Sequence, residues 1–330
     1  MMGALSINRL HSGGLITNYN CSSECAHCLY NCSPRRDKSY VTEEMAESLL
    51  DKAGSLGCRS VHIGGGEPFL DLEGLLGALS AARRAGVGID YIETNSSWFK
   101  DKASAVDALR GIRAAGAGTL LVSISPFHNE RIPFAKVEGV VAACREAGVS
   151  VFPWIAEFAD EISRFDKERG HRLEEYAGLF GVSYVSRLAA RYSLVLRGRA
   201  LRTFKDAVPA EDLDTVLERS AGGCRELSDT FHFHLDLYGG YLPGLCAGLS
   251  IDYRDLGGPL PEERYPVISA LASKGVSGLL EMAVGEHSFE PKERYFSKCD
   301  LCEDIRRFLA LERSACSNEL RPREFYEEGR

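Results

Sequence analysis

Three cysteines stand within eight residues near the start of the chain, at Cys21, Cys25 and Cys28. A spacing this short confines them to one loop, so their sulfur atoms can meet at a single metal centre. Cysteine thiolates bind zinc or iron–sulfur clusters. A structural zinc site takes four protein ligands, whereas a cluster held by three cysteines keeps one iron open to a small molecule. Cys32 follows as a candidate fourth ligand, so the loop predicts either a three-cysteine cluster or a zinc knuckle.

A second pattern begins about forty residues further on, where a short run typical of a buried strand, Val-His-Ile at residues 61–63, passes into glycines. Glycine has no Cβ, so the backbone there can approach a ligand closely. The glutamate that follows offers an anionic hydrogen-bond acceptor, and the proline restricts the turn. The pattern predicts a ligand-binding turn at the end of a buried strand, made of Gly64, Gly65, Gly66, Glu67 and Pro68.

In this order, the Cys-x3-Cys-x2-Cys loop and the Gly-Gly-Glu-Pro turn resemble the radical S-adenosylmethionine (SAM) enzymes. The resemblance implies that Cys21, Cys25 and Cys28 hold a [4Fe–4S] cluster, whose fourth iron is chelated by the amino and carboxylate groups of SAM. It also implies that the glycine turn helps to hold the methionyl amino group. The two cofactors expected at this site are therefore a [4Fe–4S] cluster and SAM.

Short apolar segments recur about every thirty residues, and helix-forming stretches lie between them. This alternation predicts right-handed βαβ units and a parallel sheet. Six units predict an α/β fold, a partial (β/α)6 TIM-type barrel, and the resemblance implies the same architecture. Both motifs lie at the carboxyl ends of strands, where such barrels bind their ligands. The expected strands span residues 15–19, 60–63, 87–94, 119–124, 149–155 and 192–196.

Other strand ends extend the candidate site. The resemblance implies that Asn95 and Ser125 contact the ribose and carboxylate of SAM, although solvated polar residues are common at strand ends. The loop after Ser125 contains His128 and Glu130. These two are either acid–base groups of catalysis or residues that tether the loop.

One stretch is strongly basic, although the chain as a whole carries a net negative charge. Residues 187–205 carry six basic side chains and no acidic one. Arg197 and Arg199 follow the sixth expected strand, and a guanidinium can bind a carboxylate through two parallel hydrogen bonds. Arg199 is therefore a candidate ligand of the SAM carboxylate or of an acidic substrate. The alternative is an exposed basic helix face.

The βα alternation ends near residue 223, and alternating apolar and polar residues at 231–237 predict a half-buried hairpin. One cysteine precedes the hairpin, one follows it, and a Cys-x2-Cys pair opens a later helix. Four thiols predict a closed site, either zinc or a second [4Fe–4S] cluster. Their spacing resembles the SPASM and twitch extensions of radical SAM enzymes, which implies an auxiliary cluster. These cysteines are Cys224, Cys246, Cys299 and Cys302.

The change of pattern predicts two domains. Residues 1–215 form the radical SAM barrel, and residues 216–330 form a smaller α+β auxiliary-cluster module. Cys32 and Cys316 stay unassigned. His232 and His234 share one face of the hairpin and either flank the second cysteine site or are packed and hydrogen-bonded.

Composition excludes several classes of protein. The formal net charge of −8 argues against a nucleic-acid-binding face, which is usually basic. No apolar run approaches the length of a membrane span, and the start lacks a cleavable signal pattern, so we expect a cytoplasmic protein without membrane contact. Eleven cysteines in such a chain indicate metal ligands and buried thiols more than disulfides.

We therefore expect a radical SAM enzyme that forms a 5′-deoxyadenosyl radical and abstracts hydrogen from a peptide or protein side chain. An electron donor such as flavodoxin or ferredoxin is the implied partner. Fewer than twenty residues precede the first expected strand, which favours the alternative, an enzyme of small-molecule or cofactor biosynthesis. A non-catalytic zinc or electron-transfer protein is the third hypothesis, but it leaves the glycine turn unexplained.

Overall fold

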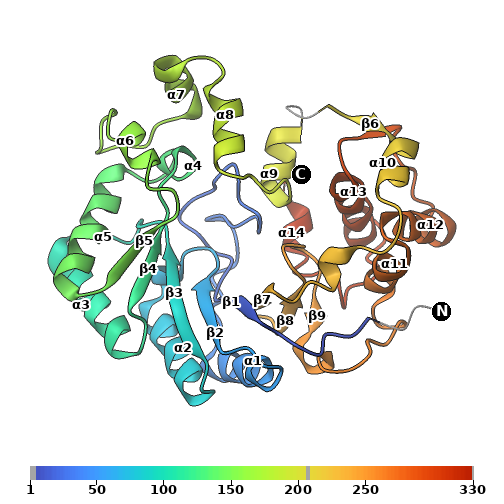
Figure 1. The fold of residues 1–330 in the computed structure, drawn as a ribbon, viewed down its shortest axis with the longest axis horizontal. Coiled ribbons are helices and arrows are strands. Elements are labelled where there is room, and N and C mark those ends of the chain that lie inside the picture. The colour runs from blue at the N-terminus through green and yellow to red at the C-terminus, as the bar shows by residue number, and fades with distance from the viewer. Residues whose placement is uncertain (1–4, 206–208, 329–330) are drawn as a thin grey trace.

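The computed structural model describes residues 5–205 and 209–328. Its centre is one sheet in the order β5-β4-β3-β2-β1-β7-β8-β9 (Figure 1). The pairings from β5 to β7 are parallel, and those of β8 are antiparallel. The strands are β1 (Ser12–Ile16), β2 (Ser60–Gly64), β3 (Gly88–Thr94), β4 (Thr119–Val122), β5 (Ser150–Pro153), β7 (His232–Asp236), β8 (Gly240–Leu242) and β9 (Ile251–Asp252).

Four long helices lie along the outer side of the parallel strands (Figure 1). They are α1 (Glu43–Ser55), α2 (Leu72–Arg84), α3 (Lys102–Ala114) and α5 (Phe134–Ala147). Thr42 caps α1, because its side chain accepts a hydrogen bond from the Met45 amide. Asp71 and Asp101 cap α2 and α3 in the same way. These caps and the buried apolar face of each helix fix where the helices cover the sheet.

Shorter elements complete the chain. Three helices, α4 (Pro126–Asn129), α6 (Phe158–Ile162) and α7 (Leu173–Phe180), pack together beyond β4 and β5. A two-stranded sheet, β6 (Glu211–Asp212) with β10 (Arg294–Tyr295), lies in the second half of the chain. The other helices are α8 (Tyr184–Arg191), α9 (Gly198–Phe204), α10 (Leu213–Arg219), α11 (Pro266–Lys274), α12 (Val276–His287), α13 (Lys298–Leu311) and α14 (Glu324–Glu327).

The sixth parallel strand does not come from residues 192–196, so that prediction is wrong. These residues form an irregular segment between α8 and α9, in which Ser193 has a left-handed φ of 53° that interrupts an extended run. The sixth parallel strand is β7, which pairs with β1 in the register Ser12↔His232. The α/β class is confirmed. The sheet stays open, with β5 and β9 as its edges.

The second half of the chain thus extends the sheet of the first half. The predicted hairpin at residues 231–237 is confirmed as β7 and β8, with Leu235 opposite Tyr241. The predicted helix after Cys299 is confirmed as α13, whose first turn is capped by Ser297. Among the residues that the structure describes, no helix is both long and apolar enough to cross a membrane.

Candidate active site

A cavity of about 290 Å³ opens at the carboxyl ends of the parallel strands. Its wall includes all three cysteines of the first loop, Cys21, Cys25 and Cys28, together with Cys32. The loop reaches this place because β1 ends at Ile16 and delivers the chain to the same edge of the sheet as the ends of β2 and β3. The structure therefore brings together the thiols that the sequence predicts as cluster ligands.

Hydrogen-bond donors surround the sulfur atoms of this loop. The Ser23 amide and the Asn95 side-chain amide both donate to Cys21 Sγ, each at 3.4 Å. The Cys32 amide donates to Cys28 Sγ at 3.4 Å. Donors of this kind stabilise a thiolate and tune iron–sulfur clusters. Three thiols line one cavity, and two of them receive such donors, which fits a [4Fe–4S] cluster with one open iron.

The three thiols differ in acidity. A hydrogen bond from the Cys32 thiol and the nearby Arg199 guanidinium lower the pKa of Cys28 to about 6, against the effect of burial. Burial raises the pKa of Cys25 to about 12 and also raises that of Cys21. Cys28 is therefore the most acidic of the three thiols, and a bound metal favours the deprotonated form of all three.

The glycine turn packs directly against the chain that leads into the cysteine loop. The Gly66 amide donates to the Asn18 carbonyl at 2.8 Å, and the Glu67 amide donates to the Asn20 carbonyl at 3.1 Å. A Cβ at Gly66 would lie 1.9 Å from the Asn20 carbonyl oxygen, so only glycine fits there. Both Gly65 and Gly66 line the cavity. The two sequence motifs therefore form one structural unit.

Glu67 is completely buried and holds the turn in place. Its carboxylate accepts hydrogen bonds from the Phe69 amide at 3.2 Å, the Thr94 hydroxyl at 2.9 Å and the Asn95 amide at 2.7 Å. Burial raises the pKa of Glu67 to about 7, and the three donors oppose that shift. Pro68, also buried, begins the short helical turn that follows. Glu67 thus ties the end of β2 to the end of β3.

The strand-end candidates divide into one that faces the cavity and one that does not. Asn95 lines the cavity, and its amide contacts Cys21 as described. At the end of β4 it is Ser123 that lines the cavity. Ser125 is buried as the cap of α4, and its hydroxyl pairs with Nδ1 of His128 at 2.8 Å. The assignment of a SAM contact to Ser125 is therefore corrected, because its hydroxyl is already engaged in the cap.

The two acid–base candidates also separate. His128 lines the cavity, and burial lowers its pKa to about 4, so its imidazole is neutral at physiological pH. Its ring lies edge-on to that of His27, at 4.7 Å between centroids. Glu130 ends α4 beside the backbone of Leu173, and burial raises its pKa. Only His128 of this pair reaches the site.

The basic turn that contains Arg199 supports the cysteine loop from outside the cavity. Its guanidinium donates to the carbonyls of Cys25 at 3.0 Å and Cys32 at 2.8 Å, and it pairs with Glu328. The Arg199 amide also donates to the Cys28 carbonyl at 3.0 Å. Arg199 lines a separate cavity of about 670 Å³. The predicted contact with the SAM carboxylate is corrected, because the guanidinium is occupied by these partners.

The four later cysteines meet at a second cavity, of about 600 Å³. Cys299 and Cys302 lie in the first two turns of α13. Basic side chains surround the thiols, and the Arg197 guanidinium lies 3.5 Å from Cys246 Sγ. Burial raises the pKa of Cys302 to about 11, so a bound metal would displace protons here as well. The cavity wall includes Cys224, Cys246, Cys299 and Cys302.

The sequence analysis did not identify several residues that line the first cavity. Tyr192 and Trp154 line it, and the Tyr192 hydroxyl hydrogen-bonds His27 Nε2 at 3.0 Å. Tyr30 and Glu93 also line it. The signal for His27 and Tyr30 was their place inside and just after the cysteine loop. Tyr192 gave no such signal, because the irregular segment after α8 reaches the cavity only through the tertiary fold.

Comparison with known proteins gives a partial match. The family profile described as the radical SAM superfamily matches residues 15–176. No curated protein matches the chain.

Three solved structures show low similarity. Streptococcus suis SuiB bound to the precursor peptide SuiA is 17% identical, with a TM-score of 0.34, over 74% of this chain and 61% of SuiB. The protein anSMEcpe with bound AdoMet is 14% identical, with a TM-score of 0.46, over 92% and 94% of the two chains. BtrN in complex with AdoMet and 2-DOIA is 16% identical, with a TM-score of 0.38, over 77% and 76%. This chain thus spans about three fifths of the length of SuiB.

The matched residues contain the cysteine loop, the glycine turn and the five strands whose ends form the first cavity. Members of this superfamily use a [4Fe–4S] cluster and SAM, and the donors around the loop fit that use. Residues 15–176 match the radical SAM superfamily, and the cysteine loop and the glycine turn within them fit a radical SAM domain.

Proposed function

We propose that this radical SAM enzyme modifies a side chain of a peptide or protein, and that a flavodoxin or ferredoxin supplies its electrons. In this proposal residues 1–215 supply five of the six parallel strands of the catalytic barrel, and residues 216–330 supply the sixth, β7, together with an auxiliary-cluster module. The cavity at the strand ends is the catalytic site. The single observation that favours a polypeptide substrate is the exposed pair of aromatic side chains, Phe152 and Trp154, at the edge strand β5 beside that cavity.

Cys21, Cys25 and Cys28 would hold the SAM-binding cluster, and Gly65, Gly66 and the Asn95 side chain would line the space for SAM. When bound, the reduced cluster would supply the one electron that cleaves SAM into methionine and a 5′-deoxyadenosyl radical, and this radical would abstract a hydrogen atom from the substrate. The protein keeps the cysteine loop rigid through the Arg199 contacts and the Glu67 network. His128, neutral and at the cavity wall, is the candidate that moves a proton after hydrogen abstraction.

Cys224, Cys246, Cys299 and Cys302 would hold a second [4Fe–4S] cluster. Four thiols around one cavity complete a cluster without an open iron. Arg197 and Lys298 line the same cavity and offset the negative charge of four thiolates. The Arg197–Arg199 turn contacts both cysteine sites, since Arg197 reaches Cys246 and Arg199 reaches the first loop. Such a cluster suits transfer of an electron away from the product.

The support for a polypeptide substrate comes from β5, an edge of the open sheet. In a closed barrel the inner face is filled by packed side chains. Here Phe152 and Trp154 share one face two residues apart and are 47% and 48% exposed. Trp154 lines the catalytic cavity, so this apolar edge continues from its mouth. An extended peptide that adds to an exposed strand edge would cover these aromatic rings.

The test uses hydrogen transfer from an unidentified substrate. Cells of the source organism are grown with deuterated amino acids, and their extract is divided by molecular mass. Each fraction is incubated anaerobically with the reconstituted enzyme, SAM and dithionite, and deuterium in 5′-deoxyadenosine is measured by mass spectrometry. We expect label from a fraction that loses its activity after protease treatment. Label from a protease-resistant fraction of low mass would support the alternative, a small-molecule substrate.

Glu67→Ala should weaken SAM binding without removing iron. The substitution leaves the buried amides of Phe69 and Asn95 and the Thr94 hydroxyl without their acceptor. Losing a hydrogen bond to a charged group costs about 1.5–3 kcal/mol, so we expect SAM affinity to fall about ten- to a hundredfold as the turn loosens. Equilibrium dialysis with SAM and iron analysis measure the two effects. Glu44→Ala, an exposed carboxylate of α1, is the control, and unchanged SAM affinity in Glu67→Ala would exclude this role.

A further inference from the structure

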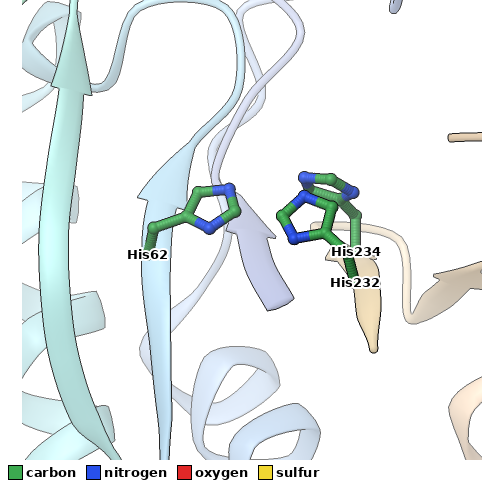
Figure 2. A group of neighbouring side chains, drawn as sticks. All are labelled: His62, His232 and His234. Carbon is green, nitrogen blue, oxygen red and sulfur yellow. The ribbon is translucent and has the colours of Figure 1, made fainter. Parts of the chain in front are cut away.

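Three histidine rings face one another across β1 (Figure 2). His62 belongs to β2, and His232 and His234 belong to β7. Strand β1 lies between these two strands, and its residue Gly14 is paired in register with both His62 and His234. The sequence analysis left His232 and His234 either beside the second cysteine site or packed and hydrogen-bonded. In the structure they gather instead with His62.

Gly14 is the residue that allows this meeting. A Cβ at Gly14 would lie 2.2 Å from His62 Nε2 and 2.8 Å from His234 Cδ2. Any side chain there would push the rings of the two neighbouring strands apart. The glycine therefore leaves the space above β1 to the imidazoles of β2 and β7.

The nitrogen atoms in this space are close together and only partly satisfied. One ring nitrogen from each of the three histidines lies within 4.8 Å of the other two. His62 and His234 are 4% and 5% exposed, and Nδ1 of His234 is buried without a hydrogen-bond partner among the residues that the structure describes. Backbone groups of Gly13 and Gly244 hydrogen-bond the rings of His62 and His234. Metal-binding histidines characteristically use one nitrogen for such a backbone contact and the other for the metal.

Packing alone accounts for part of the cluster. The His62 ring stacks on those of Tyr91 and His232, with interplanar angles of 8° and 9°. Stacking, however, gives no partner to the buried Nδ1 of His234, and burial without a partner is costly.

We propose that His62, His232 and His234 bind one divalent transition-metal ion, with Zn²⁺ as the best match to three imidazoles. Three protein ligands leave a coordination position open, as in catalytic zinc sites. Glu93 borders this position, since its carboxylate lies 3.9 Å from His62 Nε2 and also lines the catalytic cavity. The metal would therefore lie beside that cavity and offer a ligand position to an oxygen or nitrogen atom of a bound molecule. The site depends on neither the SAM chemistry nor the peptide proposal.

The first experiment measures Zn²⁺ on the protein with its iron–sulfur clusters reconstituted, so that the cysteines are occupied. Zinc content after anaerobic gel filtration should rise to one ion per chain. X-ray absorption at the zinc edge should show only nitrogen and oxygen neighbours, at about 2.0–2.1 Å. Sulfur neighbours at about 2.3 Å, or no retained zinc, would overturn the proposal.

The second experiment compares variants by calorimetric titration with Zn²⁺. His62→Gln, His232→Gln and His234→Gln should each weaken binding at least tenfold, while His287→Gln at the end of α12 should bind as the unchanged protein does. His232 is exposed, so its substitution tests the site without disturbing the core. Zn²⁺ should also raise the melting temperature of the unchanged protein and not that of His232→Gln. Equal Zn²⁺ affinity in His232→Gln and the unchanged protein would refute the site.

Discussion

Replacing Cys21, Cys25 and Cys28 together with Ala is expected to abolish formation of 5′-deoxyadenosine. The three thiols line one cavity, and a cluster that loses all its thiolate ligands does not assemble. Anaerobically reconstituted protein should lose about four irons per chain, and chromatography of a dithionite-reduced reaction with SAM should show no 5′-deoxyadenosine. Continued SAM cleavage in this variant would overturn the assignment of the first loop.

The same variant tests the second cavity. Its four cysteines lie in a different part of the chain, so the triple variant should remain brown and keep about four irons. Cys299→Ala combined with Cys302→Ala should show the converse, with the second set of irons lost and SAM cleavage retained. Cys144→Ala, a buried thiol of α5, is the control for both. Stoichiometric zinc in the triple variant would replace the second cluster with a structural zinc site.

Arg199→Ala is expected to destabilise the fold and to release iron faster, with no direct effect on SAM. The substitution removes the donors to the carbonyls of Cys25 and Cys32 and one partner of Glu328. Both side chains of this ion pair are at least 86% buried, and breaking a buried pair typically costs about 3–5 kcal/mol. Arg202 still contacts Glu328, so we expect a loss near the lower limit. Anaerobic urea unfolding measures the loss of stability, and the rate of iron release to a chelator measures the loosening of the cysteine loop.

Arg187→Ala provides a matched control from the same basic stretch. Arg187 is exposed on α8, and its guanidinium contacts Ser183 and the Phe180 carbonyl. Its loss should change neither stability nor iron release. If Arg199→Ala instead kept both properties and lost SAM affinity tenfold or more, the guanidinium would bind the SAM carboxylate after all. The two outcomes separate support of the loop from contact with the cofactor.

The features that local sequence determined are those whose physical cause is local. Cysteines within eight residues must share a loop, whatever the rest of the chain does. Thr42 caps α1 through an amide three residues away. The glycine turn could be predicted from the sequence because a run of residues without side chains is itself a local pattern. Five of the six predicted parallel strands and the hairpin of β7 and β8 followed from patterns of this range.

Other features were decided only by the tertiary structure, because they depend on contacts between distant segments. Residues 192–196 resemble a strand locally, but β7 pairs with the free edge of β1 and supplies the sixth parallel strand. Arg199 carries charge in any conformation, yet the carbonyls it meets come from a loop about 170 residues earlier. Local sequence encodes propensity and spacing, whereas the partner of a buried charge depends on how the whole chain packs.

The histidine cluster is the clearest example of a site that the tertiary structure decides and the local sequence does not. His62 and His234 are 172 residues apart, and neither stands in a spacing that predicts a metal site. Their meeting depends on β1 entering the sheet between β2 and β7 and on Gly14 taking the paired position in both registers. The sequence by itself determined the chemistry of the cysteine loop and the alternation of strands and helices. Only the tertiary structure decided which distant side chains share a site, because strand order and register are set by the packing of the entire sheet.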